Sequence, residues 1–495
     1  MDNLHTSVAY GGSAATRCRE IPLSFILQAK PYKEENSAEK RLRHMKDKTV
    51  EIFEDAPIPK AVFVNIIPSV ISMLMVLIYN LADTFFIGQT KNAYMVAAVS
   101  LATPAFLFFM AVGMLFGIGG TSLISRMLGE GRREDAKHAC SFCFWTGTVV
   151  GIVGMAIILL AIDPVAKLVG ATPDTMAYVK QYLMIVAIGV PFLVIGNIFS
   201  TIIRAEGKAN KAMAGMILGN VANIVLDPVM ILFFGWNVAG AAIATVIGNI
   251  LSAVFYIFHF LGGSSILTIH PKYYRAGKGI AAGVFSIGIP ASLNSILMST
   301  SNVLVNKLMV HYGDMAVAGL GVAMKVNMVA VMLLIGVGTG IQPLLGYNFG
   351  SGNKKRFLGI LRFSLILAVL LSLIMTAICY LGAGPMVNAF LEQEKAYSFG
   401  MQFARTLILS GPILGVLFVM INTIQSMGAA IPSLILSISR QGLLYIPVLF
   451  LFDKIFSSAK MLVMAQPVTD YLAVTLSIVL AIFAFGKYFE ERKPQ

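Results

Sequence analysis

The chain has 495 residues, of which 57% are hydrophobic and only 12% are charged, whereas soluble domains carry roughly 25% charged residues. This composition, with a mean hydropathy of +0.80, excludes an ordinary soluble globular protein and indicates a polytopic membrane protein. The net charge of +13 is concentrated in short loops between apolar runs, so it predicts cytoplasmic loops and not a nucleic-acid surface.

The chain begins with a polar segment, residues 1–56, that has no periodic apolar face. We expect it to be a disordered, cytoplasmic N-terminal tail, because it cannot bury enough apolar surface to pay for ordering. Met45, followed by a basic stretch, resembles a second start site, so residues 1–44 are predicted to be dispensable for insertion and transport. The first apolar run begins near Ala61 and is predicted to act as a signal anchor.

Twelve apolar segments follow, and each is long enough to cross about 30 Å of hydrocarbon, which takes roughly 20 helical residues. The sequence therefore predicts an all-α membrane protein with twelve transmembrane helices. The predicted spans are 61–87, 95–123, 139–161, 178–203, 211–234, 237–261, 280–309, 315–345, 357–383, 397–424, 431–452 and 463–486.

Basic residues are distributed unevenly between the two sides of these spans. Four connections on the side of the tail hold fourteen of them: Arg126, Arg132, Arg133, Lys137, Arg204, Lys208, Lys211, Lys272, Arg275, Lys278, Lys354, Lys355, Arg356 and Arg362. The six opposite connections and their edges hold eight: Lys91, Lys167, Lys180, Lys307, Lys395, Arg405, Lys454 and Lys460. Because cytoplasmic loops carry the excess of Lys and Arg, both termini are predicted to be cytoplasmic, in a multi-pass inner-membrane protein.

The second half of the chain repeats the first at a shift of 221 to 222 residues. The matched pairs include Pro68 and Pro290, Asn80 and Asn302, Gly117 and Gly338, Gly129 and Gly350, Gly131 and Gly352, Pro191 and Pro412, and Gly207 and Gly428. Each repeat holds six spans, so both insert with the same orientation, related by an axis along the membrane normal. We expect two six-helix pseudo-symmetric lobes, an N-lobe at 57–262 and a C-lobe at 280–495, joined by a cytoplasmic linker at 263–279.

Several motifs resemble those of the multidrug and toxic compound extrusion (MATE) transporters. They are IPSVISMLMVLIYNLADTFFIG at 67–88, GEGR at 129–132, its repeat GSGN at 350–353, RAEG at 204–207 and NIVLDP at 223–228. The last of these is similar to the cation-site signature of that family's N-terminal lobe. The resemblance covers residues 57–490 and implies two lobes, cytoplasmic termini and export driven by inward movement of Na+ or H+.

Carried over position by position, the resemblance implies a cation site in the N-lobe. Its residues would be Tyr79, Asp83, Asn223, Asp227 and Thr245. Some members of the family carry acids in the C-lobe near spans 7 and 8, where this chain has Asn294 and Lys325. A second cation site in the C-lobe is therefore not expected.

The residues themselves also favour an ion site. We place only two acids, Asp83 and Asp227, well inside the predicted spans, where a charge costs about 2.5–3.5 kcal/mol on insertion scales. Asn223 lies four residues before Asp227 and shares its helix face. Together with Asp83 and Thr245 these groups could offer the oxygens that Na+ needs, and the carboxylates could equally take protons. The alternative is a helix break at Asp227 and an interfacial place for Asp83.

The repeat bears on the same residues, because Asp83 falls on Val305 and Asp227 on Val448. An acid with a purely architectural role would be expected in both halves. The asymmetry predicts that only the N-lobe binds the coupling ion. No cofactor is expected besides that ion.

The substrate cavity is indicated more weakly. The 27 methionines and 32 phenylalanines could build a plastic apolar cavity, although most of them must face lipid or other helices. Four polar residues inside spans are candidates for its lining: Asn80, Asn294, Lys325 and Arg440. The two cations could instead snorkel to an interface. The expected partners are small amphipathic molecules and the lipid bilayer, with no nucleic acid, and the protein is expected to be monomeric.

The prediction is thus a cation-coupled antiporter that exports amphipathic, often cationic drugs, with a possible role in antibiotic resistance. The alternative within transport is a flippase of a lipid-linked precursor, which would need several cavity cations for a pyrophosphate. A channel would not require acids in one lobe only. An enzyme is not expected, because the hydrolase motifs are absent and the histidines are separate from the acids. Cys140 and Cys143 form a C-x-x-C, but without a second pair or a nearby histidine we expect no metal or redox role.

Overall fold

The computed structural model describes residues 51–89, 93–263, 265–391 and 393–490. Within these ranges every regular element is a helix and no strand occurs. Twelve helices are long and apolar enough to cross a membrane, which confirms the predicted all-α fold of twelve spans. The tail up to residue 50 lies outside the described residues.

The first six spans form the N-lobe, with the short helix α5 after the third. Their bounds are α2 (Ile58–Gly88), α3 (Ala93–Gly129), α4 (Arg133–Leu160), α5 (Ile162–Leu168), α6 (Met176–Ala205), α7 (Ala209–Pro228) with the π-helical turn Val229–Phe233, and α8 (Asn237–Leu261). In the fifth span Pro228 has no N–H to donate, so the α-helical ladder loses a hydrogen bond where the π-helical turn begins.

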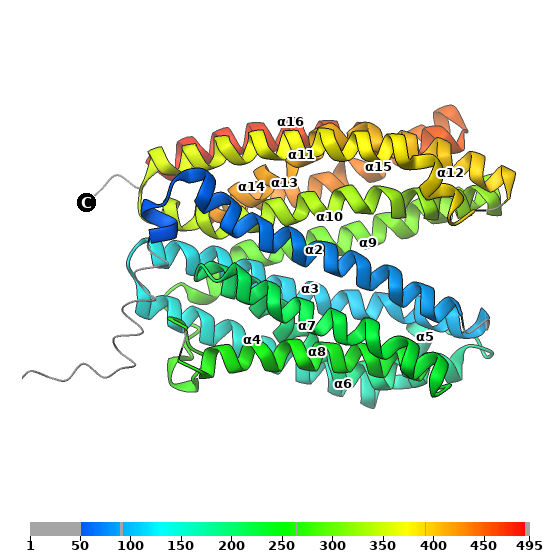
Figure 1. Cartoon of the computed structure of the whole chain (residues 1–495), viewed down its shortest axis with the longest axis horizontal. Coiled ribbons are helices and arrows are strands. Elements are labelled where there is room, and N and C mark those ends of the chain that lie inside the picture. Colours follow the sequence, from blue (N-terminus) through cyan, green and yellow to red (C-terminus); the bar gives the residue numbers. More distant parts are fainter. Residues whose placement is uncertain (1–50, 90–92, 264, 392, 491–495) are drawn as a thin grey trace, which may run out of the picture.

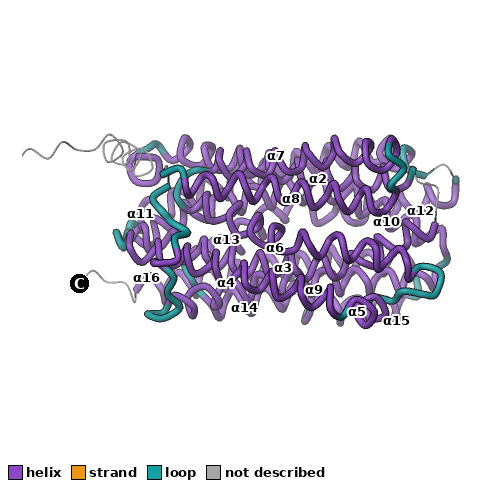
Figure 2. Tube along the Cα trace, turned by 90° about the horizontal axis from the view of Figure 1, so that it is seen from below, coloured by secondary structure: helices purple, strands orange, loops and turns teal. Residues whose placement is uncertain are grey.

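The last six spans form the C-lobe, in which two spans are interrupted helices. Their bounds are α9 (Ile280–Met309), α10 (Asp314–Gly350), α11 (Lys354–Asn388), α12 (Glu394–Leu407) with α13 (Gly411–Ser426), α14 (Ala430–Ile438) with the π-helical turn Ser439–Leu443 and α15 (Tyr445–Phe456), and α16 (Ala459–Glu490). The spans run alongside one another, and both lobes are helical throughout (Figures 1 and 2).

The repeat is visible in how the second span of each lobe ends. α3 and α10 both have 37 residues, and each is followed by a tight turn into the next helix. The turn residues Gly131 and Gly352 have φ angles of 75° and 70°, the left-handed region that glycine adopts without steric cost. These two glycines are matched positions of the repeat, so the same local chemistry sets the same turn in both lobes.

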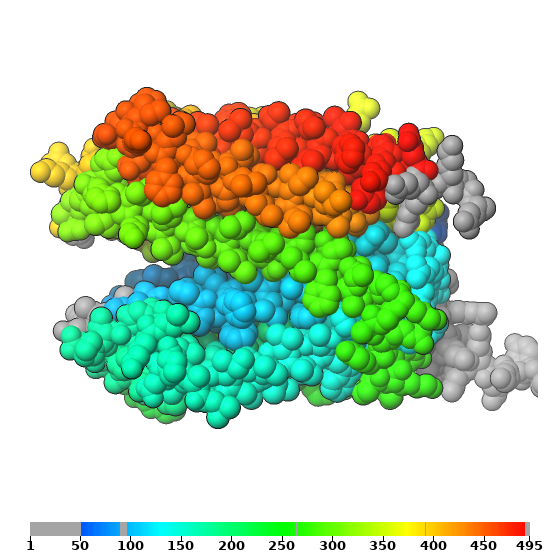
Figure 3. Space-filling model, turned by 180° about the vertical axis from the view of Figure 1, so that it is seen from behind, coloured from blue at the N-terminus to red at the C-terminus, as the bar shows by residue number. Residues whose placement is uncertain are grey.

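The two lobes meet at one end of the bundle, the end where α2 begins and α16 ends, here called the terminal end. A side chain at Gly129 would collide with the backbone oxygen of Tyr347, and one at Gly350 with the backbone oxygen of Arg126. The two contacts exchange under the repeat, so α3 and α10 cross as pseudo-symmetric partners. At the opposite, distal end the lobes part, and Figure 3 shows an open cleft between them.

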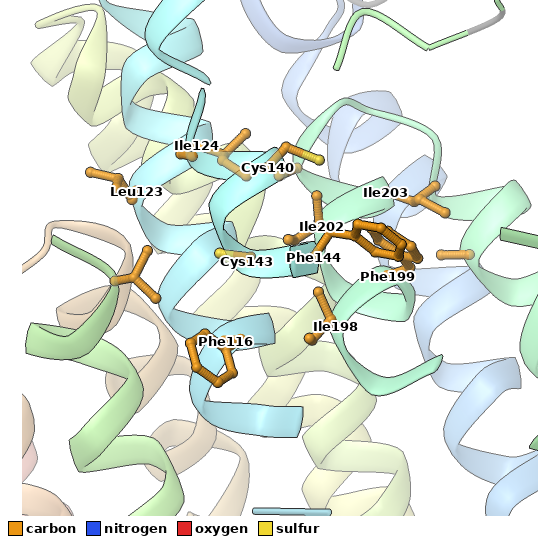
Figure 4. Close-up of a cluster of buried hydrophobic side chains, with 14 of the residues drawn as sticks. Phe116, Leu123, Ile124, Cys140, Cys143, Phe144, Ile198, Phe199, Ile202 and Ile203 are labelled. Carbon is orange, nitrogen blue, oxygen red and sulfur yellow. The ribbon is translucent and has the colours of Figure 1, made fainter. Parts of the chain in front are cut away.

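The core of the N-lobe lies between α3, α4 and α6. Phe144 stacks on Phe199 with ring centroids 5.4 Å apart, and apolar side chains surround them (Figure 4). Cys140 and Cys143 are fully buried, free thiols in this cluster. Both thiols therefore serve as small apolar packing groups.

One expectation for the tail has to be corrected. Residues 51–55 form a π-helical turn directly before α2, and Phe53 is fully buried. The side chain of Phe53 packs on the ring of Tyr347, with centroids 5.2 Å apart. The end of the predicted disordered segment is thus part of the folded protein.

Candidate functional site

The five residues of the predicted cation site come from three helices that meet in the distal half of the N-lobe. Asp83 lies five residues before the end of α2 at Gly88, and Asp227 six residues before Phe233, where the fifth span ends. Thr245 lies eight residues into α8. At 1.5 Å per residue, all three lie about 8–12 Å from the distal helix ends. The site is therefore inside the membrane-spanning part of the lobe, in the distal half of the bundle.

A hydrogen-bonded group of side chains on α7 and α8 forms one side of this site. With the amide of Asn223 oriented so that both of its atoms meet suitable partners, its Nδ2 donates to Asp227 Oδ2 at 2.9 Å. Its Oδ1 accepts from the backbone N–H and the hydroxyl of Thr245, at 3.1 and 3.2 Å. Asn223, Asp227 and Thr245 are all buried. The predicted sharing of one helix face by Asn223 and Asp227 thus produces a direct contact.

Residues of α2 and α6 complete the site from the other side. The hydroxyl of Tyr79 lies beside the side chain of Thr245 and interacts electrostatically with Asp83 and Asp227. The hydroxyl of Tyr182, on α6, interacts with the same two acids. The structure therefore brings all five predicted residues together and adds Tyr182, which the sequence did not single out. A tyrosine six residues into an apolar span looks like an interfacial anchor, so only the packing of the four helices reveals its place.

The electrostatics of this site are unbalanced. Within the described ranges neither Asp83 nor Asp227 forms a salt bridge with Lys, Arg or His. Asp227 is fully buried, and its Oδ1 has no hydrogen-bond partner in the described part of the chain. A buried carboxylate without compensation is costly. This donor set of carboxylate, amide and hydroxyl oxygens suits a hard cation such as Na+, and either carboxylate can accept a proton.

The weaker candidates for the cavity have different environments. Asn80 and Asn294 are half-buried on α2 and α9, each of which packs against a helix of the opposite lobe. Both remain candidates for the cavity wall. Lys325 places its ammonium over the ring of Phe390, 5.2 Å from the centroid, just beyond the end of α11. This contact at the distal end favours snorkelling of Lys325 over a place in the cavity.

Arg440 does not offer a free charge to a substrate, in contrast to the prediction. Its guanidinium is buried, lies 3.4 Å from Asp470 Oδ1 and stacks over Phe418 at 5.3 Å. Asp470 also accepts from Gln466 Nε2 at 3.1 Å. The prediction that only Asp83 and Asp227 lie well inside spans was therefore wrong, because Asp470 is a third acid within a span, eleven residues into α16, and is buried.

A further correction concerns the histidines, which were expected to be separate from the acids. His259 Nε2 lies 2.7 Å from Glu206 Oε1, and both residues are buried. Glu206 also accepts a hydrogen bond from the hydroxyl of Ser265. This group lies at the terminal end, where it ties the linker to the N-lobe, so its position is structural and remote from the cation site.

Both halves of the chain resemble known proteins. A profile of the MatE family matches it twice, over residues 68–229 and 290–451. The two matches begin 222 residues apart, in agreement with the internal repeat. The chain is 31% identical to the multidrug export protein MepA of Staphylococcus aureus over 413 residues, which cover 83% of this chain and 91% of the relative. The MepA of Staphylococcus saprophyticus is 30% identical over 412 residues.

Solved structures have the same fold. One of a MATE protein in complex with MaL6 superposes with a TM-score of 0.85, at 23% identity, over 90% of this chain and 99% of that chain. The outward-facing conformation of a multidrug resistance MATE family transporter of the MOP superfamily gives the same TM-score and identity. The arrangement of two six-helix lobes around a cleft therefore has solved counterparts.

Proposed function

Because the chain belongs to the MatE family of multidrug efflux transporters, we propose that it exports amphipathic, often cationic drugs in exchange for Na+ or H+. The protein is a multi-pass membrane transporter and not an enzyme. Its relatives are named multidrug export proteins, and this chain is proposed to act on the same broad class of molecules. It does so as a monomer, since one chain carries both lobes and the complete cation site.

One observation carries the proposal of coupling. Asp83 and Asp227 share a buried site that lacks a basic partner in the described part of the chain, and Asp227 Oδ1 has no hydrogen-bond partner there. Their negative charge is therefore balanced best by a cation taken up from outside or by protons. The bound ion changes the charge of the N-lobe, which forms one side of the cleft that the drug must leave (Figure 3).

The proposed cycle uses the two ends of the bundle in turn. In this structure the lobes touch at the terminal end and part at the distal end (Figure 3). With cytoplasmic termini, as the excess of Lys and Arg in the terminal loops supports, this state faces outward. Uptake of the ion by Asp83 and Asp227 then accompanies release of a cationic drug, because the two positive charges compete for the same negative site.

A flippase for a lipid-linked precursor is supported less well. Its cavity would need several unpaired cations to hold a pyrophosphate. Arg440 is paired with Asp470, and Lys325 stacks on Phe390 at the distal end. The charges that the sequence offered for such a substrate are thus engaged elsewhere, whereas the acids of the N-lobe suit a cationic drug.

The test is efflux of a fluorescent cationic dye from proteoliposomes that contain the purified protein. The Na+ gradient and the pH gradient are imposed separately. Each drives the ion from the extracellular face of the protein to its cytoplasmic face. We expect dye efflux under at least one of the two gradients. If one gradient drives no dye efflux, transport is not coupled to that ion. Equal dye movement with and without either gradient would mean uncoupled transport and would refute the antiporter.

The orientation is tested with two variants, each with a single cysteine at the terminal end of the bundle. The cysteines replace Glu134 and Lys355, the second residues of α4 and α11, which are both exposed. Labelling of intact cells by a membrane-impermeant maleimide should leave both unmodified, and permeabilised cells should label at both. Modification of either cysteine in intact cells would place the termini outside. The cleft would then face the cytoplasm.

A further inference from the structure

Residues 51–56, which precede the first span, dock on the C-lobe. The cation-site residues of that span lie in the N-lobe. Arg356, the third residue of α11, donates from Nε to the backbone oxygen of Phe53 at 2.8 Å and from Nη2 to that of Ala56 at 2.7 Å. Asn348 donates to the same Phe53 oxygen at 3.2 Å. The hydroxyl of Tyr347 donates to Glu54 Oε1 at 2.7 Å. Residues 51–56 are thus fixed to the C-lobe by charge-assisted hydrogen bonds and by the buried ring of Phe53.

The helix that follows this segment belongs to both lobes. α2 begins beside the C-lobe at the terminal end and crosses to the N-lobe at the distal end (Figure 1). Its first half packs closely on α10, because side chains at Gly336 and Gly340 would collide with the backbone at Val70 and Ile66. Its last turns carry Tyr79 and Asp83 to the cation site on α7 and α8.

The docking surface for residues 51–56 also lies on the seam between the lobes. Tyr347 holds Glu54 with its hydroxyl and packs on Phe53 with its ring. Its backbone oxygen meets Gly129 of the N-lobe. The residue that anchors the segment is therefore part of the contact that closes the terminal end, so the docked segment and the closed seam support each other.

The other repeat contains a related arrangement, in which the segment before the first span of one lobe again contacts the third span of the opposite lobe. α4 and α11 begin at matched positions of the repeat, 221 residues apart. The linker that precedes α9 runs along α4, where Trp145 donates to the backbone oxygen of Ile269 at 3.0 Å and Ser141 to that of His270 at 3.1 Å. The linker is covalently continuous with both lobes, whereas residues 51–56 are held to the C-lobe by non-covalent contacts alone.

We propose that residues 51–56 form a latch that holds the transporter closed at its terminal end and releases the C-lobe when the lobes part there. The start of α2 cannot remain fixed to α10 while its distal half stays with the N-lobe and the lobes separate at the terminal end. Undocking of the latch frees α2 to move with one lobe. The latch thereby sets the balance between the state with a distal cleft and the state open at the terminal end.

The test measures opening of the seam directly. Ser125 is fully buried, and its hydroxyl lies against Gly346 across the seam. In a protein whose native cysteines are replaced by alanine, Ser125→Cys is labelled with a maleimide in lipid nanodiscs without any ion gradient. Arg356→Gln removes three hydrogen bonds to the latch, to the backbone oxygens of Ile52, Phe53 and Ala56, and should raise the labelling rate by about ten-fold or more. Tyr347→Phe loses one hydrogen bond and should raise the rate roughly five-fold.

Matched controls separate the latch from general destabilisation. Lys355→Gln removes a neighbouring exposed charge and should label like the parent protein. Tyr347→Phe keeps the packed ring, so it decides the matter if Arg356→Gln does not elute as a monodisperse species. Deletion of residues 1–44 should leave the rate unchanged, and deletion of residues 1–56 behind a new start methionine should raise it. Equal rates for Tyr347→Phe, Arg356→Gln and Lys355→Gln would overturn the latch, whatever ion the transporter uses.

Discussion

The two lobes place a buried polar cluster among the same four spans, but they balance its charge differently. In the N-lobe, Asp83 and Asp227 lie among the first, fourth, fifth and sixth spans without a basic partner in the described residues. In the C-lobe, Asp470 lies among the corresponding spans with Arg440 at 3.4 Å. The C-lobe cluster thus contains its own cation, whereas the described residues supply none to the two acids of the N-lobe.

The comparison extends to the backbone. Asp227 lies two residues before the π-helical turn Val229–Phe233, and Arg440 lies within the π-helical turn Ser439–Leu443. The first turn ends the fifth span of the N-lobe and the second interrupts the fifth span of the C-lobe; such turns are frequent at functional sites. The two turns begin 210 residues apart, so they are not matched positions of the repeat. The proposed difference in ion exchange therefore rests on the side chains, because Asp470 has Arg440 as a partner and the acids of the N-lobe have no basic partner in the described residues.

The largest effect is expected from substitution of an acid in the N-lobe cluster. Asp227→Asn keeps the size and the hydrogen bond from Asn223 but cannot ionise, so the ion site loses charge without losing its packing. We expect normal expression, retained dye binding and gradient-driven efflux reduced to the level of protein-free liposomes. Asp83→Asn should behave in the same way. Full efflux by purified Asp227→Asn would show that the cation site lies elsewhere, and a loss of folded protein would point to a structural role.

A smaller effect on transport, but a clear effect on stability, is expected in the C-lobe. Asp470→Asn leaves the guanidinium of Arg440 buried without its counter-charge, which should cost about 3–5 kcal/mol and lower the unfolding temperature in detergent. The double variant Arg440→Met/Asp470→Leu removes both charges and should recover most of this stability. Its gradient-driven efflux should stay near that of the parent. Loss of coupling in the stable double variant would mean that the C-lobe pair takes part in ion exchange.

The features that could be predicted from sequence are those set by local residues. Each span is an apolar run bounded by polar turns, and Gly131 and Gly352 mark the repeated turns by themselves. Asn223 and Asp227 could be placed on one helix face because a spacing of four residues fixes that relation. The twelve spans and the contact within α7 follow from such short-range rules.

The features that were missed depend on which helices become neighbours. Arg440 and Asp470 are thirty residues apart and pair only because the eleventh and twelfth spans pack together. Phe53 meets Arg356 across about three hundred residues, so its segment looks like part of a featureless tail. Tyr182 joins the two acids only through the packing of α6 against α7 and α8. In each case the role of the residue depends on its long-range partner and not on its residue type.

The smallest effect is expected at the C-lobe positions that match the two acids of the N-lobe. Val305 is buried in the apolar core of the C-lobe, and Val448 is half-buried beside it. Val305→Ala and Val448→Ala each remove two methyl groups, at a cost of about 1–2 kcal/mol, and change no charge. Unfolding temperatures should therefore fall slightly while dye efflux under either gradient stays near that of the parent. If either valine variant lost coupling as severely as Asp227→Asn, the ion pathway would have to run through both lobes, and the charge asymmetry between them could not be its basis.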